Sequence, residues 1–189
     1  MSGFAALLIV GWAAWRRKWR DLGYVQPRSW PLSIAVAIIG GAAFKFTMKA
    51  LVMPLLGANP INRAYHFLAG NRAMIPAMIF TIIFTAGFGE ETLFRSYFFE
   101  RLGKLFGSSV VAKIAIVLLT SALFAAAHYH DQGIDGTEQA AIVGLVFGTI
   151  FAITRSIFPL MIAHTSFDLT AYAMIYWNLE TRIAHLIFH

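Results

Sequence analysis

The 189 residues are 59% hydrophobic and 13% charged, with a mean hydropathy of +0.68. Soluble domains are about half apolar and a quarter charged, so this composition indicates a membrane protein. The absence of cysteine excludes a disulfide framework, a thiolate metal site and a cysteine nucleophile. The net charge of +6 does not predict binding to nucleic acid, because the basic residues lie between apolar runs rather than in one patch.

The first apolar run extends from Ser2 to Trp15 and is followed by a basic cluster. The cluster consists of Arg16, Arg17, Lys18 and Arg20. A cleavable signal peptide has its positive charges before its apolar core, so this segment is not predicted to be one. At about 14 residues the run is shorter than the roughly 17 to 25 that a membrane span needs, so we expect a short or tilted helix.

Five longer apolar runs follow, separated by turn-rich stretches. The runs cover residues 32–57, 74–99, 108–130, 138–154 and 157–178, and turn signals are dense at 57–60 and 131–136. A bilayer leaves unpaired backbone groups unsatisfied, and these runs are too uniformly apolar for barrel strands, so we expect helices. The sequence therefore predicts an all-α fold: a polytopic transmembrane bundle of about five or six helices, forming one domain over residues 1–189.

The lysine and arginine residues are distributed unequally between alternate connections of this predicted bundle. One side has Arg16, Arg17, Lys18, Arg20, Arg28, Arg95, Arg101, Lys104 and Arg155, and the other has Arg63, Arg72 and Arg182. Cytoplasmic loops are enriched in such residues, so the 16–31 loop is predicted to be cytoplasmic. Lys45 and Lys49 instead lie one turn apart inside the second run, where they need anionic partners or a watery cavity.

Two adjacent glutamates interrupt the apolar run 74–99. A charged side chain at the centre of a bilayer costs at least about 2.5 kcal/mol, so Glu90 and Glu91 are expected to have partners or a function. In a helix, Glu91 and Arg95 share a face at the i,i+4 spacing with the acid first, which favours an ion pair. This pair fits a structural role at a helix crossing. Glu90 lacks such a partner and is therefore the stronger candidate for a functional residue.

Histidines lie in two of the later runs. His128 ends the run 108–130, at a position where a lone histidine is ordinarily interfacial. His164 and Asp168 lie one helical turn apart, so both side chains project from one face. In this arrangement the carboxylate either accepts the second imidazole N–H and orients the ring, or binds a metal ion together with the histidine.

These residue types fit hydrolysis of a peptide bond by two mechanisms. In the first, His128, His164 and Asp168 bind Zn²⁺ as the cofactor, and Glu90 is the general base toward the bound water. In the second, no metal is needed: Glu90 activates water, while His164 and Asp168 polarise the carbonyl or stabilise the oxyanion. The sequence allows both mechanisms.

Three ordered motifs in the chain resemble those of the CAAX-protease and bacteriocin-processing (CPBP or Abi) family of intramembrane proteases. Glu90-Glu91-Thr92-Leu93-Phe94-Arg95 fits EExxxR, Phe124 to His128 fits FxxxH, and His164 to Asp168 fits HxxxD/N. Each motif alone is weakly specific, but their order and their placement on successive apolar runs are specific together. The resemblance covers about residues 80–170, the expected catalytic core.

The resemblance implies an α-helical membrane endopeptidase with an intramembrane catalytic centre. The residues it assigns to that centre are Glu90, Glu91, Arg95, His128, His164 and Asp168. The implied partners are a peptide or protein substrate at the membrane and the lipid bilayer, and the implied mechanism uses either zinc or a glutamate-activated water. Asp168 stands where eukaryotic prenyl proteases of the family have asparagine. We therefore expect a prokaryotic member in the plasma membrane.

Two other functions could use the same residues. A proton-coupled transporter also places acids and histidines inside a helical bundle. Such transporters usually have paired repeats and broken helices at matched positions, and the sequence has neither. A non-catalytic membrane scaffold or immunity protein would keep the fold without turnover, but the retention of all six motif residues argues against it.

Overall fold

The computed structural model describes residues 2–16 and 18–188 of the chain. Met1, Arg17 of the basic cluster and His189 lie outside the described residues. In chain order the helices are α1 (Ser2–Arg16), α2 (Trp30–Thr47), η1 (Met48–Val52), α3 (Met53–Leu55), η2 (His66–Leu68), η3 (Arg72–Met74), α4 (Ile75–Phe80), η4 (Thr81–Tyr97), α5 (Phe98–Phe106), α6 (Val110–Thr154), α7 (Phe158–Tyr176) and α8 (Glu180–Ala184). The described residues contain no strand, which confirms the predicted all-α fold.

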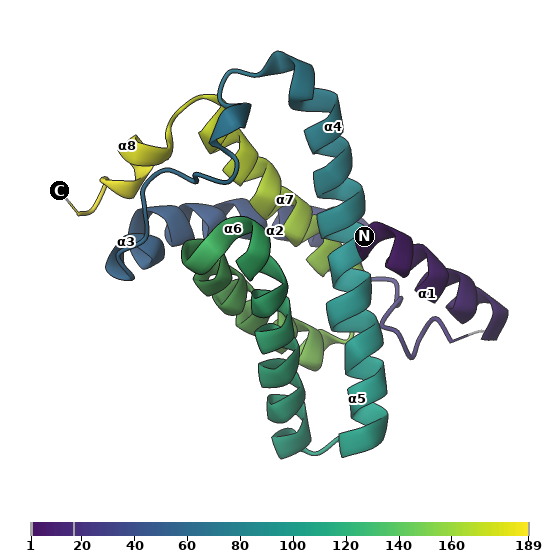
Figure 1. Ribbon diagram of the computed structural model, residues 1–189. Coiled ribbons are helices and arrows are strands. Elements are labelled where there is room, and N and C mark those ends of the chain that lie inside the picture. Colours follow the sequence, from purple (N-terminus) through teal and green to yellow (C-terminus); the bar gives the residue numbers. More distant parts are fainter. Residues whose placement is uncertain (1, 17, 189) are drawn as a thin grey trace.

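Three continuous helical segments are long and apolar enough to cross a membrane. They are Trp30–Leu55, Arg72–Phe106 and Val110–Thr154. Figure 1 shows the second of them as one rod with α4 and α5 at its two ends. Large apolar side chains such as Ile39 and Val111 are more than half exposed on these segments. Exposed apolar surfaces of this extent indicate contact with lipid, so the protein is a membrane protein.

The loop predicted at 131–136 is wrong, because α6 remains helical on both sides of this segment. The helix changes direction at Gly133, whose backbone has φ 64° and ψ −158°. Only glycine adopts this conformation readily, since it has no Cβ. Figure 1 shows the two green arms of α6 folded back on each other. A single residue therefore replaces the expected loop, and both arms keep their hydrogen bonds close to the turn.

The segment that carries the paired glutamates is wider than the α-helix assumed from the sequence. η4 has π-type hydrogen bonds, and at its end the Phe98 N–H donates to the Leu93 carbonyl five residues back. Widened turns of this kind occur often at functional sites. The ion pair between Glu91 and Arg95 nevertheless forms, at 3.1 Å.

α7 lies between α2 and η4, and glycines on both neighbours allow close contact. A Cβ at Gly41 of α2 would lie 2.2 Å from the Ala163 carbonyl oxygen. A Cβ at Gly87 of η4 would lie 3.0 Å from the Met161 carbonyl oxygen. Small residues at such contacts let membrane helices pack backbone to backbone. His164 of α7 is consequently held inside the bundle, where it is 4% exposed.

The two ends of the bundle are closed by different connections. At one end the loop before α2 lies against the α6–α7 connection, where the Ile157 N–H donates to the Gly23 carbonyl at 2.9 Å. At the other end the Asn59 N–H donates to Asp135 Oδ2 at 3.0 Å, beside the reversal of α6. The loop with many basic residues and the loop with few thus belong to different ends of the bundle.

Lys49 has the anionic partner that the sequence analysis expected. Lys49 is in the π-type turn η1. Its Nζ lies 3.3 Å from Glu180 Oε1 and donates to the Pro60 carbonyl. Glu180 is 2% exposed and also accepts from the Asn62 N–H at 2.9 Å. These contacts tie α8 and the loop after α3 to η1.

Candidate active site

Arg95 and Glu91 form a buried ion pair next to the candidate site. Arg95 Nη1 lies 3.1 Å from Glu91 Oε1, and the two side chains are 2% and 0% exposed. The guanidinium carbon of Arg95 lies 4.2 Å from the ring centroid of Phe124 and 5.8 Å from that of Phe147. A guanidinium is attracted to aromatic faces at such distances. The expected Glu91–Arg95 pair is thus present, and two aromatic rings hold its cation in place.

Glu91 also fixes the orientation of His164. The Nδ1–H of His164 donates to Glu91 Oε1 at 2.7 Å, across 73 positions of sequence. This corrects one of the two roles expected for Asp168, because Asp168 Oδ2 lies 3.7 Å from the other nitrogen, Nε2. The packing of α7 on η4 places Glu91, and not the carboxylate one turn away, in line with Nδ1. The same oxygen of Glu91, Oε1, therefore contacts both Arg95 and His164.

Nε2 of His164 is approached by two further carboxylates. Glu90 Oε2 lies 3.9 Å from it and Asp168 Oδ2 lies 3.7 Å from it. Both distances exceed a hydrogen bond and leave room for a bridging oxygen atom. The Glu90 and Asp168 side chains are 19% and 30% exposed, whereas His164 is 5% exposed. A water molecule or a substrate carbonyl can therefore reach the point where these three side chains converge.

His128 comes from the first arm of α6. Its Nδ1–H donates to the Phe124 carbonyl at 2.8 Å, so its Nε2 has no partner within its own helix turn. The Phe124 ring lies against it, with ring centroids 4.5 Å apart, and its centroid lies 6.0 Å from that of His164. Phe124 of the FxxxH motif thus lies close to both histidines.

A cavity of about 1060 Å³ connects the candidate residues. Glu90, His128, His164 and Asp168 all line it, together with residues of α1, α2 and the 56–71 loop. Glu91 and Arg95 are not among its lining residues and lie behind its wall. The three motifs therefore meet at one cavity: four residues face its interior and two support them.

Tyr65 and Lys45 also line this cavity, although no motif includes them. Burial first, and then the negative charges of Asp168, Asp131 and Glu90, raise the pKa of the Tyr65 phenol above its ordinary value of 10.0. Tyr65 is thus a neutral hydrogen-bond donor at physiological pH. No pattern in the 56–71 loop pointed to it. The sequence did single out Lys45, because it is a cation inside an apolar run.

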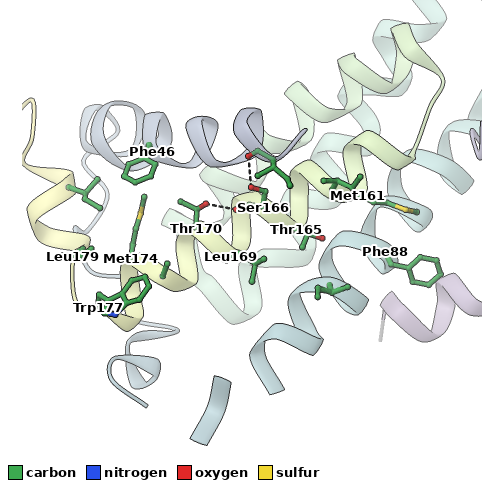
Figure 2. Close-up of a pocket in the computed structure, with 15 residues that line it drawn as sticks. Phe46, Phe88, Met161, Thr165, Ser166, Leu169, Thr170, Met174, Trp177 and Leu179 are labelled. Carbon is green, nitrogen blue, oxygen red and sulfur yellow. Dashed lines mark hydrogen bonds between the residues drawn. The ribbon is translucent and has the colours of Figure 1, made fainter. Parts of the chain in front are cut away.

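A second cavity, of about 780 Å³, lies on the other face of α7 (Figure 2). Figure 2 shows that its lining is mainly apolar, with Phe46, Leu169, Met174 and Trp177 around it. None of the six motif residues lines it. It is therefore not the candidate active site.

The zinc ligands predicted from the sequence are not assembled as a metal site. Over residues 2–16 and 18–188, no three His, Cys, Asp or Glu side chains form a group that could hold a metal ion. His164 has one nitrogen committed to Glu91, and His128 has one committed to a backbone carbonyl. Both of these contacts use Nδ1 and leave Nε2 free, as is usual for histidines that bind a metal ion, so zinc at His128, His164 and Asp168 remains a prediction from the sequence.

The fold and the cavity define a helical membrane protein with a glutamate, histidine and aspartate cluster between its helices. Residues 72–170, more than half of the chain, match the family described as type II CAAX prenyl endopeptidase Rce1-like. The chain therefore belongs to this family, which confirms the predicted relationship to CAAX proteases. No individual curated protein and no solved structure matches it. Membership implies a membrane protease with a protein substrate.

Proposed function

We propose that the protein is an intramembrane endopeptidase that hydrolyses a peptide bond with water activated by Glu90. The observation that carries this proposal is the convergence of Glu90 and Asp168 on Nε2 of His164, at the wall of a large cavity. Family membership supports the reaction class. A prokaryotic plasma membrane remains the expected location.

In the proposed reaction, Glu90 is the general base. Its carboxylate accepts a proton from a water molecule in the cavity as the oxygen attacks the scissile carbonyl. His164 is an imidazolium in this step, since its Nδ1–H stays on Glu91, and its Nε2–H donates to the oxyanion that forms. The proton held by Glu90 passes to the leaving amine as the C–N bond breaks. The products are one new carboxyl terminus and one new amino terminus.

Glu91 and Arg95 are positioning residues in this scheme. Glu91 holds Nδ1 of His164, so Nε2 faces the cavity. Arg95 neutralises the buried carboxylate of Glu91 and is held by aromatic rings. An orienting carboxylate behind a catalytic imidazole serves the same purpose in other hydrolases.

Glu90→Gln is the first test of this function. We expect cleavage of a peptide in detergent to fall about 10²- to 10⁴-fold, the usual contribution of a general base. Glu90 is partly exposed and has no hydrogen-bonded partner among the described residues, so the thermal stability should change little. Glu138→Gln is the matched control, since Glu138 does not line the cavity. Full activity of Glu90→Gln would contradict the proposed base.

His164→Ala tests the oxyanion contact. Loss of one preorganised donor lowers kcat by about 10²- to 10³-fold in comparable sites. Kinetics of the purified variant should show this loss mainly in kcat. A normal kcat would exclude His164 from the reaction.

Metal content distinguishes the two mechanisms that the sequence allowed. The measurement is elemental analysis of purified, active protein and of the His128→Ala and His164→Ala variants. Stoichiometric zinc that disappears in both variants would select the zinc mechanism. An active preparation without zinc would select the direct action of Glu90 on water.

A further inference from the structure

Lys45 is a buried cation in the wall of the catalytic cavity. It lies on α2, outside the segment that matches the family, and the residue is 6% exposed. Its Nζ donates to Gln139 Oε1 at 2.7 Å and lies 4.9 Å from the ring centroid of Phe167. Phe167 and Gln139 line the same cavity as Glu90. The mechanism above assigns no role to this ammonium group.

The neighbours of Lys45 leave its charge incompletely compensated. Among the described residues, no carboxylate lies within 4.0 Å of its Nζ, whereas Lys49 on the next turn pairs with Glu180 at 3.3 Å. The charges that act on Lys45 from further away are those of Lys49, Asp168 and Glu180. An ammonium has three donors, and one amide oxygen and one ring occupy only part of its capacity. A buried cation in this state favours an anionic ligand.

Lys45 also marks the junction between two cavities. A second cavity beside it, of about 300 Å³, which we call the annex, lies between the 58–64 loop and the reversal of α6. Lys45, Gln132 and Gln139 line both the annex and the catalytic cavity. Asp135 faces the annex too, but its carboxylate accepts from the Asn59 N–H. A peptide held at Glu90 and continuing toward the annex would therefore pass Lys45.

We propose that Lys45, with Gln139, binds a carboxylate of the peptide substrate while the scissile bond lies at Glu90. This inference rests on the proposed endopeptidase function and adds a charge requirement to it. The carboxylate is either the free C-terminus of the substrate or an acidic side chain, since both offer the same two acceptor oxygens. Lys45 is thus a specificity residue that contributes to binding and takes no part in proton transfer.

The test compares matched internally quenched peptides of one sequence that the wild-type protein cleaves in detergent. One pair differs only in a C-terminal carboxylate or carboxamide, and a second pair differs only in Glu or Gln within the peptide. We expect the carboxylate form of one pair to be cleaved about 10- to 100-fold more efficiently, mainly through KM, because a charge-assisted hydrogen bond is lost in its neutral partner. The pair that shows the difference identifies which carboxylate binds.

Lys45→Met keeps the length of the side chain and removes its charge. We expect this variant to lose the preference and to cleave the charged and neutral peptides with equal kcat/KM. Lys113→Met, an exposed position on α6, should retain the wild-type preference. If the wild-type protein cleaved the charged and the neutral peptide of each pair equally well, the proposal would be overturned, whether or not Lys45→Met folds. The endopeptidase function would remain intact. Failure of the wild-type protein to cleave any peptide in the screen for that first sequence would instead overturn the proposed function.

Discussion

At the scale of single residues, one carboxylate oxygen connects the structural and the reactive parts of the site. Glu91 Oε1 lies 3.1 Å from Arg95 and 2.7 Å from His164. Glu90, its neighbour in sequence, faces the cavity and is 19% exposed. Two adjacent residues of the same type are therefore expected to respond differently to the same substitution.

Glu91→Gln should reduce both activity and stability. It leaves the buried Arg95 without a counter-charge, a change that costs about 3 to 5 kcal/mol when one partner of a buried pair is removed. It also weakens the hydrogen bond that orients His164. Thermal unfolding in detergent and peptide cleavage measure the two effects. Glu90→Gln is the matched control and should affect cleavage alone; equal stability of the two variants would contradict this division of roles.

At the scale of helices, the position of α7 depends on close contact with α2. Gly41 is next to the Ala163 carbonyl, whereas the neighbouring Gly40 has nothing within 4 Å of the position of a Cβ. The two glycines are adjacent on one helix, so they separate the effect of packing from that of helix propensity.

Gly41→Ala should destabilise the protein and reduce cleavage. Forcing an extra methyl group into a packed contact costs about 1 to 3 kcal/mol and moves the backbone. A shift of α7 would move His164 and Asp168 away from Glu90. Gly40→Ala should leave melting temperature and cleavage unchanged or slightly improved, because alanine favours helix. If the two variants melted at the same temperature, close packing at Gly41 would not be important.

The pair between Lys49 and Glu180 should anchor α8. Glu180→Gln removes a carboxylate that is 2% exposed and accepts from the Asn62 N–H, so we expect a loss of about 3 kcal/mol or more. Lys18→Met is a control at an exposed pair, with side chains 48% and 44% exposed, and should cost no more than about 1 kcal/mol. Limited proteolysis of the C-terminal segment would detect release of α8. Unchanged protection in Glu180→Gln would contradict this role.

At the scale of the whole molecule, the sequence predicted the helical membrane fold and which motifs meet. Helix spacing also predicted the Glu91–Arg95 pair, because both residues lie on one element. The contact between Glu91 and His164 depends on how α7 packs against η4, 73 positions away, and local spacing holds no information about it. The same applies to Tyr65 and to the replacement of a loop by one turn at Gly133. The π-type hydrogen bonds of η4 were missed because an apolar run has the same composition in either kind of helix.

The most direct measurement of the central claim is mass spectrometry of a cleaved peptide in ¹⁸O-labelled water, with wild-type protein and Glu90→Gln side by side. Hydrolysis by an activated water predicts two fragments from the wild-type reaction, with one ¹⁸O atom in the new carboxyl terminus. Glu90→Gln, folded and equally stable, should leave the peptide intact over the same period. Cleavage by Glu90→Gln at the wild-type rate, or wild-type fragments without the label, would contradict the assignment of Glu90 as the base that activates water.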